Sequence, residues 1–220
     1  MEKVYFNAGC ALNLYKGDME GRLLEYIQTV YGAAAPHRIC CHYNPKVEAG
    51  TLIVNVCAGC DRRFGSLYEG VSTISIWELI DQMADFPFPD YGGMKMSVHD
   101  ACPIRGKPQV HQAIRSLLGK MRIEVVETEC HGTRSVCCGD SFYPAHPLEE
   151  VHGNMKSRAA SMPCEDVVVY CVSCIKSMTI GGKRPRYMID LLFQEQTEAQ
   201  VYDTVAWHET LRAYMEAHSG

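Results

Sequence analysis

The chain has 220 residues and a formal net charge of −5, and it is long enough to bury a hydrophobic core without disulfide cross-links. Its acidic balance argues against a nucleic-acid partner, because a nucleic-acid-binding surface requires clustered Lys and Arg. The first residues lack the basic and apolar regions of a signal peptide, and no segment approaches about 18 consecutive apolar residues. We therefore expect a cytoplasmic protein with no direct membrane span.

The first half of the chain predicts strands that alternate with helices. A short β-rich run covers residues 4–6. Residues 20–30 place Leu23 and Ile27 at helical spacing, which predicts an amphipathic helix. Residues 51–56 form a continuous apolar run, which is typical of a strand with helices on both faces of its sheet.

Residues 86–93 are rich in Pro and Gly, which interrupt regular structure, and they separate two similar halves. We predict a first domain at 1–88, a second at 94–193 and a C-terminal helical extension at 194–220. The elements predicted after the boundary are strands at 96–98, 122–127 and 166–170 and helices at 109–120, 148–161 and 198–217.

The two halves repeat one order of elements. Segment 75–81, near the end of the first half, resembles segment 186–192 near the end of the second. Strands alternating with helices indicate parallel sheets, in which ligands bind at the carboxyl ends of the strands. We predict an α/β fold of two pseudo-repeated, Rossmann-like halves with their sites at those strand ends.

Ten of the twelve cysteines form one pattern written twice: a lone Cys, a vicinal Cys-Cys pair and a Cys-x-x-Cys motif. Five thiols per copy suit neither disulfides, which need even numbers, nor a tetrahedral zinc site, which uses four. In a reducing cytosol this density of cysteine favours metal binding or redox chemistry. The candidate ligands are Cys10, Cys40, Cys41, Cys57 and Cys60 in the first set and Cys102, Cys137, Cys138, Cys171 and Cys174 in the second.

The local chemistry of the motifs favours iron and sulfide over a single ion. Each Cys-x-x-Cys motif follows an apolar strand and opens a predicted helix, whose free N–H groups favour the thiolate form. The two side chains of a vicinal pair point to opposite sides of an extended backbone, so they cannot easily chelate one small ion. An ordinary four-iron cubane takes four cysteines, so a fifth thiolate indicates a bridging ligand.

The segment Cys137-Cys138-Gly139, flanked by Cys102 and by the motif at 171–174, resembles the cysteine-rich Cys-Cys-Gly domain family of heterodisulfide reductase-like iron–sulfur proteins. The resemblance covers roughly residues 4–193 in two copies. It implies that each set of five cysteines holds a noncubane [4Fe-4S] cluster and that a disulfide substrate is cleaved between the two clusters. The chain has no evident flavin or nicotinamide motif, so we expect an electron-donating iron–sulfur or flavin protein as its partner.

The first copy departs from the family pattern in two places. His42, rather than Gly, follows its vicinal pair, and only fifteen residues separate Cys41 from Cys57. Thirty-two residues separate Cys138 from Cys171 in the second copy. We therefore expect the first site to be remodelled relative to the second.

Two polar residues that precede Cys102 are candidate catalytic residues. His99 and Asp100 are placed to hydrogen-bond cluster sulfur or to supply a proton during reduction. A structural role is the alternative for His99, as it is for His42.

The remaining cysteines and the nearby basic residues have simpler interpretations. Cys130 and Cys164 lie outside the pattern and are interpreted as small buried hydrophobes, although Cys130 falls in a polar segment. Arg62, Arg63 and Lys176 follow the Cys-x-x-Cys motifs and are expected at the solvated surface.

Three functions stay open at this point. The first is disulfide reduction with electrons from a partner, and the second is a non-catalytic protein that relays electrons to a quinone or another carrier. The third is a zinc-stabilised scaffold or a thiol redox sensor. Metal analysis separates the third from the others, and turnover with a disulfide separates the first from the second.

Overall fold

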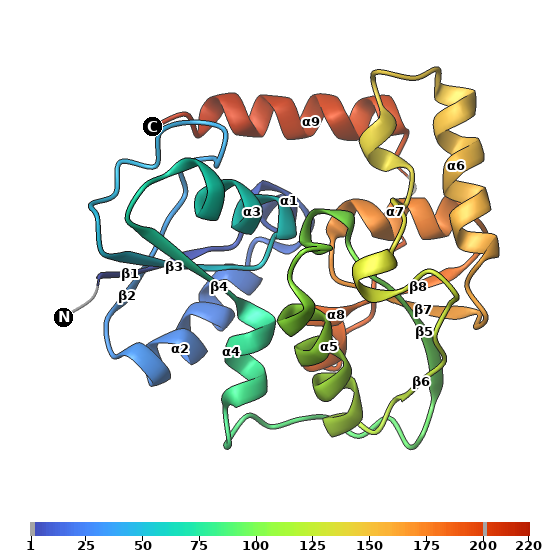
Figure 1. Cartoon of the computed structure of the whole chain (residues 1–220), viewed down its shortest axis with the longest axis horizontal. Coiled ribbons are helices and arrows are strands. Elements are labelled where there is room, and N and C mark those ends of the chain that lie inside the picture. Colours follow the sequence, from blue (N-terminus) through green and yellow to red (C-terminus); the bar gives the residue numbers. More distant parts are fainter. Residues whose placement is uncertain (1–2, 200–201) are drawn as a thin grey trace. The chain divides into compact units, whose positions relative to one another are not determined.

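The computed structural model describes residues 3–199 and 202–220. It divides into two compact units, Met1–Gln82 together with Ala206–Gly220, and Met83–Val205. Each unit is built on a four-stranded parallel sheet with helices against it (Figure 1), which confirms the predicted α/β class. Most of the segment predicted as a C-terminal extension is grouped with the first unit.

The first unit contains four strands and five helices among its described residues. They are β1 (Lys3–Asn7), α1 (Cys10–Lys16), α2 (Met19–Tyr31), β2 (Ala34–Pro36), β3 (Thr51–Asn55), α3 (Ala58–Leu67), β4 (Val71–Ser75), α4 (Ile76–Gln82) and most of α9 (Thr204–Ala217). The strand order is β2-β1-β3-β4, and β1 pairs with β3 along its whole length. Phe6, Leu23, Ile53 and Phe64 are fully buried, so the apolar spacing seen in the sequence does face the core.

The second unit repeats this order of strands. Its elements are β5 (Lys95–His99), η1 (Cys102–Ile104), α5 (Pro108–Lys120), β6 (Glu124–Val125), η2 (Gly132–Arg134), η3 (Asp140–Phe142), α6 (Leu148–Ala160), β7 (Asp166–Val169), α7 (Val172–Ile180), β8 (Arg184–Tyr187) and α8 (Met188–Leu192). The strand order is β6-β5-β7-β8, the same as in the first sheet. The repeated segments correspond to the β4–α4 and β8–α8 passages, so the internal repeat extends beyond the cysteines.

This strand order fixes where ligands can bind. In each sheet the first strand lies between the second and third, so the chain crosses in opposite directions after the first and third strands. Loops that leave the carboxyl ends of two such strands diverge and open a crevice. The lone cysteine follows the first strand and the Cys-x-x-Cys motif follows the third in both units, so both stand at this crevice.

Two predicted elements are shorter than the sequence suggested. The strand predicted at 122–127 is reduced to the two residues of β6, and its later start follows from Arg122, whose left-handed φ of 53° an extended strand excludes. The helix predicted at 198–217 begins at Thr204, where the Asp203 carboxylate accepts a hydrogen bond of 2.7 Å from the Val205 N–H. Residues 200 and 201 of that prediction lie outside the described residues.

Three edge strands, β2, β4 and β8, were not predicted, and two of them contain proline. β2 ends at Pro36, and β8 contains Pro185 opposite Val167. Proline cannot donate to a sheet ladder, but an edge strand has one side without a partner and tolerates it. Both strands occupy sheet edges, which explains how sequences that break the usual strand pattern still pair.

Candidate functional site

The first set of cysteines converges at the carboxyl ends of β1 and β3. Cys10 opens α1, Cys57 is the N-cap of α3 and Cys60 lies in its first turn, whereas the vicinal pair stands in the loop after β2. The side chains form an unbroken series of sulfur contacts in which each thiol hydrogen-bonds to the next. The order of this series is Cys10, Cys40, Cys41, Cys60 and Cys57.

The second set converges in the same way at the carboxyl ends of β5 and β7. The lone cysteine opens η1, the Cys-x-x-Cys motif opens α7 and the vicinal pair lies between η2 and η3. The order of sulfur contacts is Cys102, Cys137, Cys138, Cys174 and Cys171, which matches the first set position by position. All twelve cysteines are free thiols, so no disulfide competes with this arrangement.

The first member of each vicinal pair is stabilised as a thiolate by its neighbours, and in the first set a hydrogen bond from Cys60 also lowers the pKa of Cys57, to about 7. Hydrogen bonds from Cys10 and Cys41 lower the pKa of Cys40, and hydrogen bonds from Cys102 and Cys138 lower the pKa of Cys137. The donors in turn have raised pKa values, because only the protonated thiol can donate these bonds and because burial disfavours the thiolate. Cys40 and Cys137, each second in its series of contacts, are therefore the thiols with the most strongly lowered pKa, and we call each the acidic sulfur of its set.

Backbone N–H groups support this acidic sulfur in both sets. The Gly139 N–H donates to Cys137 Sγ at 3.3 Å, and the Ser141 hydroxyl lies 2.9 Å from the same sulfur. In the first set the His42 N–H supplies the equivalent bond to Cys40. The replacement of Gly by His after the vicinal pair therefore preserves the backbone donor.

Position 139 requires glycine because of its backbone conformation and its close packing. It has a left-handed φ of 103°, and a Cβ there would lie 2.8 Å from the backbone nitrogen of Met155. Its absence from the first copy reflects different packing, since His42 does not adopt positive φ. The first site is remodelled in its loop while its sulfur contacts are conserved.

The C-terminal segment positions the first vicinal pair. The Cys40 N–H donates to the His218 carbonyl at 2.9 Å, and Asn13 of α1 donates to the Tyr214 hydroxyl at 3.0 Å. α9 thus contributes to the first unit by fixing the loop that carries two of the five sulfurs.

Each site also contains a buried N–H donor with no hydrogen-bond partner among the described residues. These are the Asn7 side-chain amide at the end of β1 and His99 Nε2 at the end of β5, and both residues stand three positions before the lone cysteine. Asn7 is 3% exposed and His99 is 1% exposed. A buried donor without an acceptor is costly, so its occurrence at the same position in both units indicates that an acceptor belongs there.

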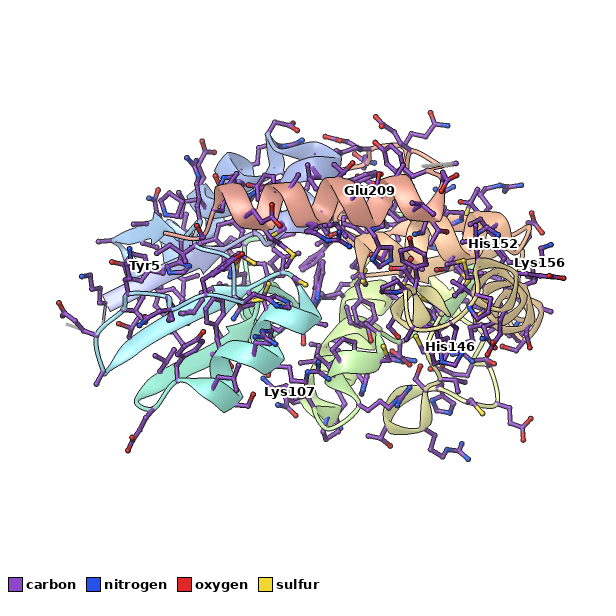
Figure 2. The ribbon with its side chains drawn as sticks, turned by 90° about the horizontal axis from the view of Figure 1, so that it is seen from above. Tyr5, Lys107, His146, His152, Lys156 and Glu209 are labelled. Carbon is purple, nitrogen blue, oxygen red and sulfur yellow. The ribbon has the colours of Figure 1, made fainter. Side chains whose placement is uncertain are left out.

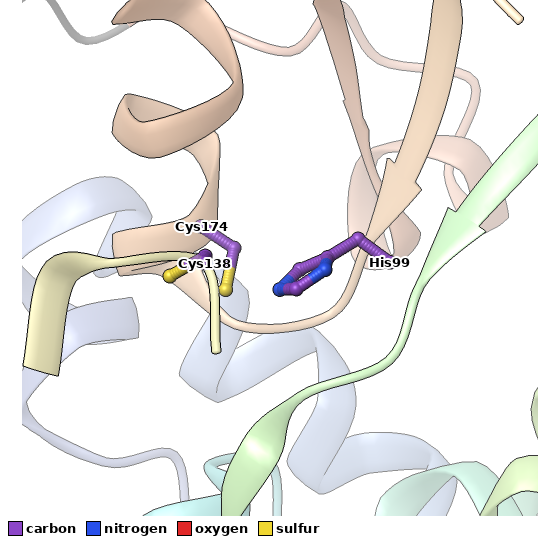
Figure 3. A group of neighbouring side chains, drawn as sticks. All are labelled: His99, Cys138 and Cys174. Atoms are coloured by element: carbon purple, nitrogen blue, oxygen red, sulfur yellow. The ribbon is translucent and has the colours of Figure 1, made fainter. Parts of the chain in front are cut away.

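The hydrogen bonding of His99 fixes which of its nitrogens carries the proton. Arg158 Nε donates to His99 Nδ1 at 3.1 Å, and burial, then the nearby Arg158 charge, lowers the His99 pKa to about 3. The ring is therefore neutral with its proton on Nε2. The ligand atoms of His99, Cys138 and Cys174 lie within 4.8 Å of one another (Figure 3), so this N–H is directed at the sulfur set.

This tautomer argues against His99 as a metal ligand. A ligating histidine normally donates its second ring N–H to an acceptor, but His99 Nδ1 accepts from a permanently charged guanidinium. Its Nε2 is consequently a donor rather than a lone pair for a metal ion. A three-ligand site of His99, Cys138 and Cys174 for one zinc ion does not fit this arrangement.

Asp100 is held by a dense network of donors. Its carboxylate accepts bonds from Arg115 Nη2 at 2.8 Å, the Tyr170 hydroxyl at 2.9 Å and the Gly132 N–H at 2.6 Å. Burial raises the pKa of this carboxyl, but hydrogen bonds from His111 and Arg115 hold it well below its usual range. Asp100 thus orders the segment leading into η1, and its participation in catalysis stays a prediction.

Two interpretations of nearby residues were wrong. Cys130 is exposed rather than a buried hydrophobe, and Cys164 is half-buried. Lys176 is 2% exposed and forms an ion pair of 2.5 Å with Asp140, so it does not lie at the solvated surface. Of the two arginines, Arg63 is half-buried and donates from Nε to the Cys41 carbonyl at 3.1 Å.

Arg158 is the residue that sequence reasoning missed. It lies at the helical spacing of Val151, Met155 and Ala159, and all four are buried on α6. Lys156 of the same helix, labelled in Figure 2, is exposed. The sequence did contain a signal for this residue, namely an arginine among the apolar positions of a predicted helix. A charge on a buried helix face requires a special environment.

Among the described residues, no helix is both long and apolar enough to cross a membrane. Comparison with protein-family models, with curated proteins and with solved structures gave no match. The chemistry of the two sulfur sites therefore rests on their own geometry.

Proposed function

We propose that this protein is an iron–sulfur oxidoreductase component that holds a noncubane [4Fe-4S] cluster in each unit and reduces a disulfide. The observation that carries the proposal is the convergence of five thiols in each unit through one order of contacts. Five sulfurs exceed what a tetrahedral zinc site uses and match a four-iron core with an additional bridging thiolate. The acidic sulfurs, Cys40 and Cys137, are the candidates for that bridge.

The two unpaired, buried N–H donors offer a structural test of whether an iron–sulfur cluster fits these sites. Asn7 and His99 each present an N–H with no acceptor among the described residues beside their sulfur set. Inorganic sulfide and thiolate sulfur accept N–H hydrogen bonds, and such bonds tune the potential of iron–sulfur centres. Gly9 has no side chain, which leaves room beside the sulfurs of the first site. A Cβ added to Gly9 would lie 2.9 Å from Cys57 Cβ and 3.6 Å from Cys60 Sγ.

When bound, a cluster of this kind supplies one-electron transfer and iron sites with affinity for thiolate. Reduction of one disulfide to two thiols consumes two electrons and two protons. Two one-electron centres in one chain match that requirement. The chain has no evident flavin or nicotinamide motif, so the electrons would come from a partner iron–sulfur or flavin protein in a reducing cytoplasm.

The chain's own residues divide the remaining work. The ten cysteines of the two sets would hold the metal, and backbone donors at His42 and Gly139 stabilise the thiolates of Cys40 and Cys137. Asn7 and His99 offer unpaired N–H groups beside the sulfur sets, where cluster sulfur would accept them. The Asp100 network fixes the segment that carries Cys102.

Metal content is the first test. We expect protein purified without oxygen to contain about eight irons and about eight acid-labile sulfides per chain, with two paramagnetic signals on partial oxidation or reduction. Zinc in place of iron would overturn the proposal and support a zinc-stabilised scaffold.

Turnover is the second test. Protein with both clusters should reduce small disulfides when an artificial low-potential donor supplies electrons, and thiol release should depend on both cluster sets. Intact clusters without turnover of any disulfide would overturn the reductase assignment in favour of electron relay to a quinone or another carrier.

The His99 donor predicts a shift in reduction potential. The substitution His99→Phe removes the N–H while retaining a ring, so the reduced, more negative form of the second cluster loses one hydrogen bond. A bond worth about 1 kcal/mol corresponds to a shift on the order of 40 mV toward negative potential. A redox titration followed by electron paramagnetic resonance measures it.

The conservative variant controls for packing. His99→Gln keeps both an acceptor for Arg158 and an N–H donor, so its potential should stay closer to that of the unmodified protein. Equal potentials in His99→Phe and in the unmodified protein would show that His99 does not donate to the cluster.

A further inference from the structure

His37 presents an unpartnered ring nitrogen beside the first set of cysteines. The residue follows β2 and stands three positions before Cys40. It is 7% exposed, and its Nδ1 has no hydrogen-bond partner among residues 3–199 and 202–220. A buried polar atom without a partner is costly, so a partner belongs at this nitrogen.

The nitrogen stands at the sulfur site itself. His37 lines a small cavity of about 10 Å³ that lies within the first unit. The cavity is also lined by Asn7 and by four of the five thiols of the first set, which are Cys10, Cys40, Cys41 and Cys60. Whatever occupies this space therefore meets sulfur and imidazole nitrogen together.

The contacts of the ring fix its orientation and its proton. The His37 backbone N–H donates to the Phe6 carbonyl at 2.7 Å, which anchors the residue beside β1. Ring Nε2 lies 2.9 Å from the Pro45 carbonyl oxygen. A carbonyl only accepts, so Nε2 carries the proton and Nδ1 of the neutral ring keeps a lone pair. Tyr5 and Phe64 pack edge-on against the ring, each with its centroid 5.6 Å away.

His37 is the reverse of His99 in its hydrogen bonding. At His99, Nδ1 accepts from Arg158 and the nitrogen left without a partner is a donor. At His37, the ring N–H is bonded to a backbone carbonyl and the nitrogen left without a partner is a lone pair. A metal-ligating histidine has the second arrangement, because the bonded N–H fixes the tautomer and turns the lone pair to the metal.

We propose that His37 Nδ1 is a ligand of the metal centre held by the first set of cysteines, so that this centre has one imidazole nitrogen among its thiolates. The inference rests on the proposed function for the presence of a cluster, and it adds that the two centres differ in their donor atoms. An additional protein ligand leaves one position fewer for an external sulfur, which favours electron transfer at the first centre.

A water molecule is the alternative partner of Nδ1. The cavity is about the size of one water, and the Asn7 amide would donate to the same molecule. Four thiols on the cavity wall favour the metal, because thiolates and imidazole are both good ligands of iron and zinc. The two cases differ in one observable, a nitrogen bonded directly to the metal.

Isotope labelling tests the assignment without altering the ring. Full-length protein carrying Cys137→Ala, expected to retain only the first centre, is prepared with histidine labelled with the heavy nitrogen isotope at Nδ1 or at Nε2. We expect pulsed electron paramagnetic resonance to show hyperfine coupling to a directly bonded nitrogen, and only the Nδ1 label to change it. The same spectra of unmodified holoprotein make the result independent of Cys137→Ala. Absence of a directly bonded nitrogen would overturn the proposal in favour of water.

Side-chain variants separate His37 from its neighbours. His37→Gly should lose the nitrogen coupling, and added imidazole should restore it by occupying the vacated space. His42 is an exposed histidine that follows the vicinal pair, so His42→Gln should keep the coupling. Asn7→Ala should keep it too, because the unpaired Asn7 nitrogen is a donor. Equal loss in His42→Gln and His37→Gly would contradict the assignment to His37.

Metal content is measured on the same samples, so the two proposals can fail separately. Iron at the first site without a directly bonded nitrogen contradicts only the His37 ligand. Zinc at the first site contradicts the proposed cluster there, and cobalt(II) exchanged for that zinc reports the same nitrogen coupling. A first site that takes up neither metal contradicts both proposals.

Discussion

Replacement of Cys137 by alanine is expected to remove one cluster and leave the other. Cys137 Sγ contacts Cys102 and Cys138 and accepts hydrogen bonds from Ser141 and Gly139, so it is the acidic sulfur of the second set. Iron should fall from about eight to about four per chain, and one of the two paramagnetic signals should disappear. Elemental analysis with electron paramagnetic resonance measures both.

The repeat offers matched comparisons for this experiment. Cys40→Ala should remove the other signal, because Cys40 occupies the equivalent place in the first set. Cys164→Ala should leave iron unchanged, because Cys164 lies outside both series of sulfur contacts and its backbone N–H bonds Ser97 Oγ at 2.9 Å. Equal iron loss in Cys164→Ala and Cys137→Ala would contradict the assignment of ligands.

Asp100→Asn is expected to cause the largest loss of stability outside the cysteines. The new amide would place N–H groups against donors from Arg115, Tyr170 or Gly132, and it would remove a buried negative charge. Disruption of one partner of a buried ion pair costs about 3–5 kcal/mol. Denaturant unfolding should show a decrease of that size in the free energy of unfolding, with loss of the second cluster at milder conditions.

Asp166, an aspartate in a more exposed ion pair, serves as the control. Asp166 pairs with Arg184 at 3.2 Å and with Arg186 at 3.5 Å, and these arginine side chains are 60% and 27% exposed, whereas Asp100 is fully buried. Pairs of this kind contribute about 0–1 kcal/mol, so Asp166→Asn should leave stability nearly unchanged. Similar losses in the two variants would show that the Asp100 network is not a special source of stability.

Helices and central strands followed directly from the sequence. Leu23 and Ile27 of α2, and Val110 and Leu117 of α5, repeat at helical spacing and are buried on one face. β3 and β7 are continuous apolar runs because both faces of their sheets are covered. Pattern and burial agree in these elements, so local preference and tertiary packing favour one structure.

The edge strands and the loop conformations could not be predicted from the sequence. β2 and β8 contain proline and form only because a sheet edge accepts a strand with missing donors. The later start of β6 follows from the left-handed backbone of Arg122. Both effects depend on neighbours distant in sequence, which periodicity does not report.

The sequence by itself determined the doubled α/β architecture and the ten cysteines that meet in two sets. Their spacing relative to strand ends and helix starts is a local property, and parallel topology brings those ends together. Only the tertiary structure decided which charges are buried and where unpaired donors point. Arg158, Lys176 and the N–H groups of Asn7 and His99 owe their roles to contacts between segments far apart in the chain, and desolvation there turns ordinary polar side chains into strong electrostatic ones.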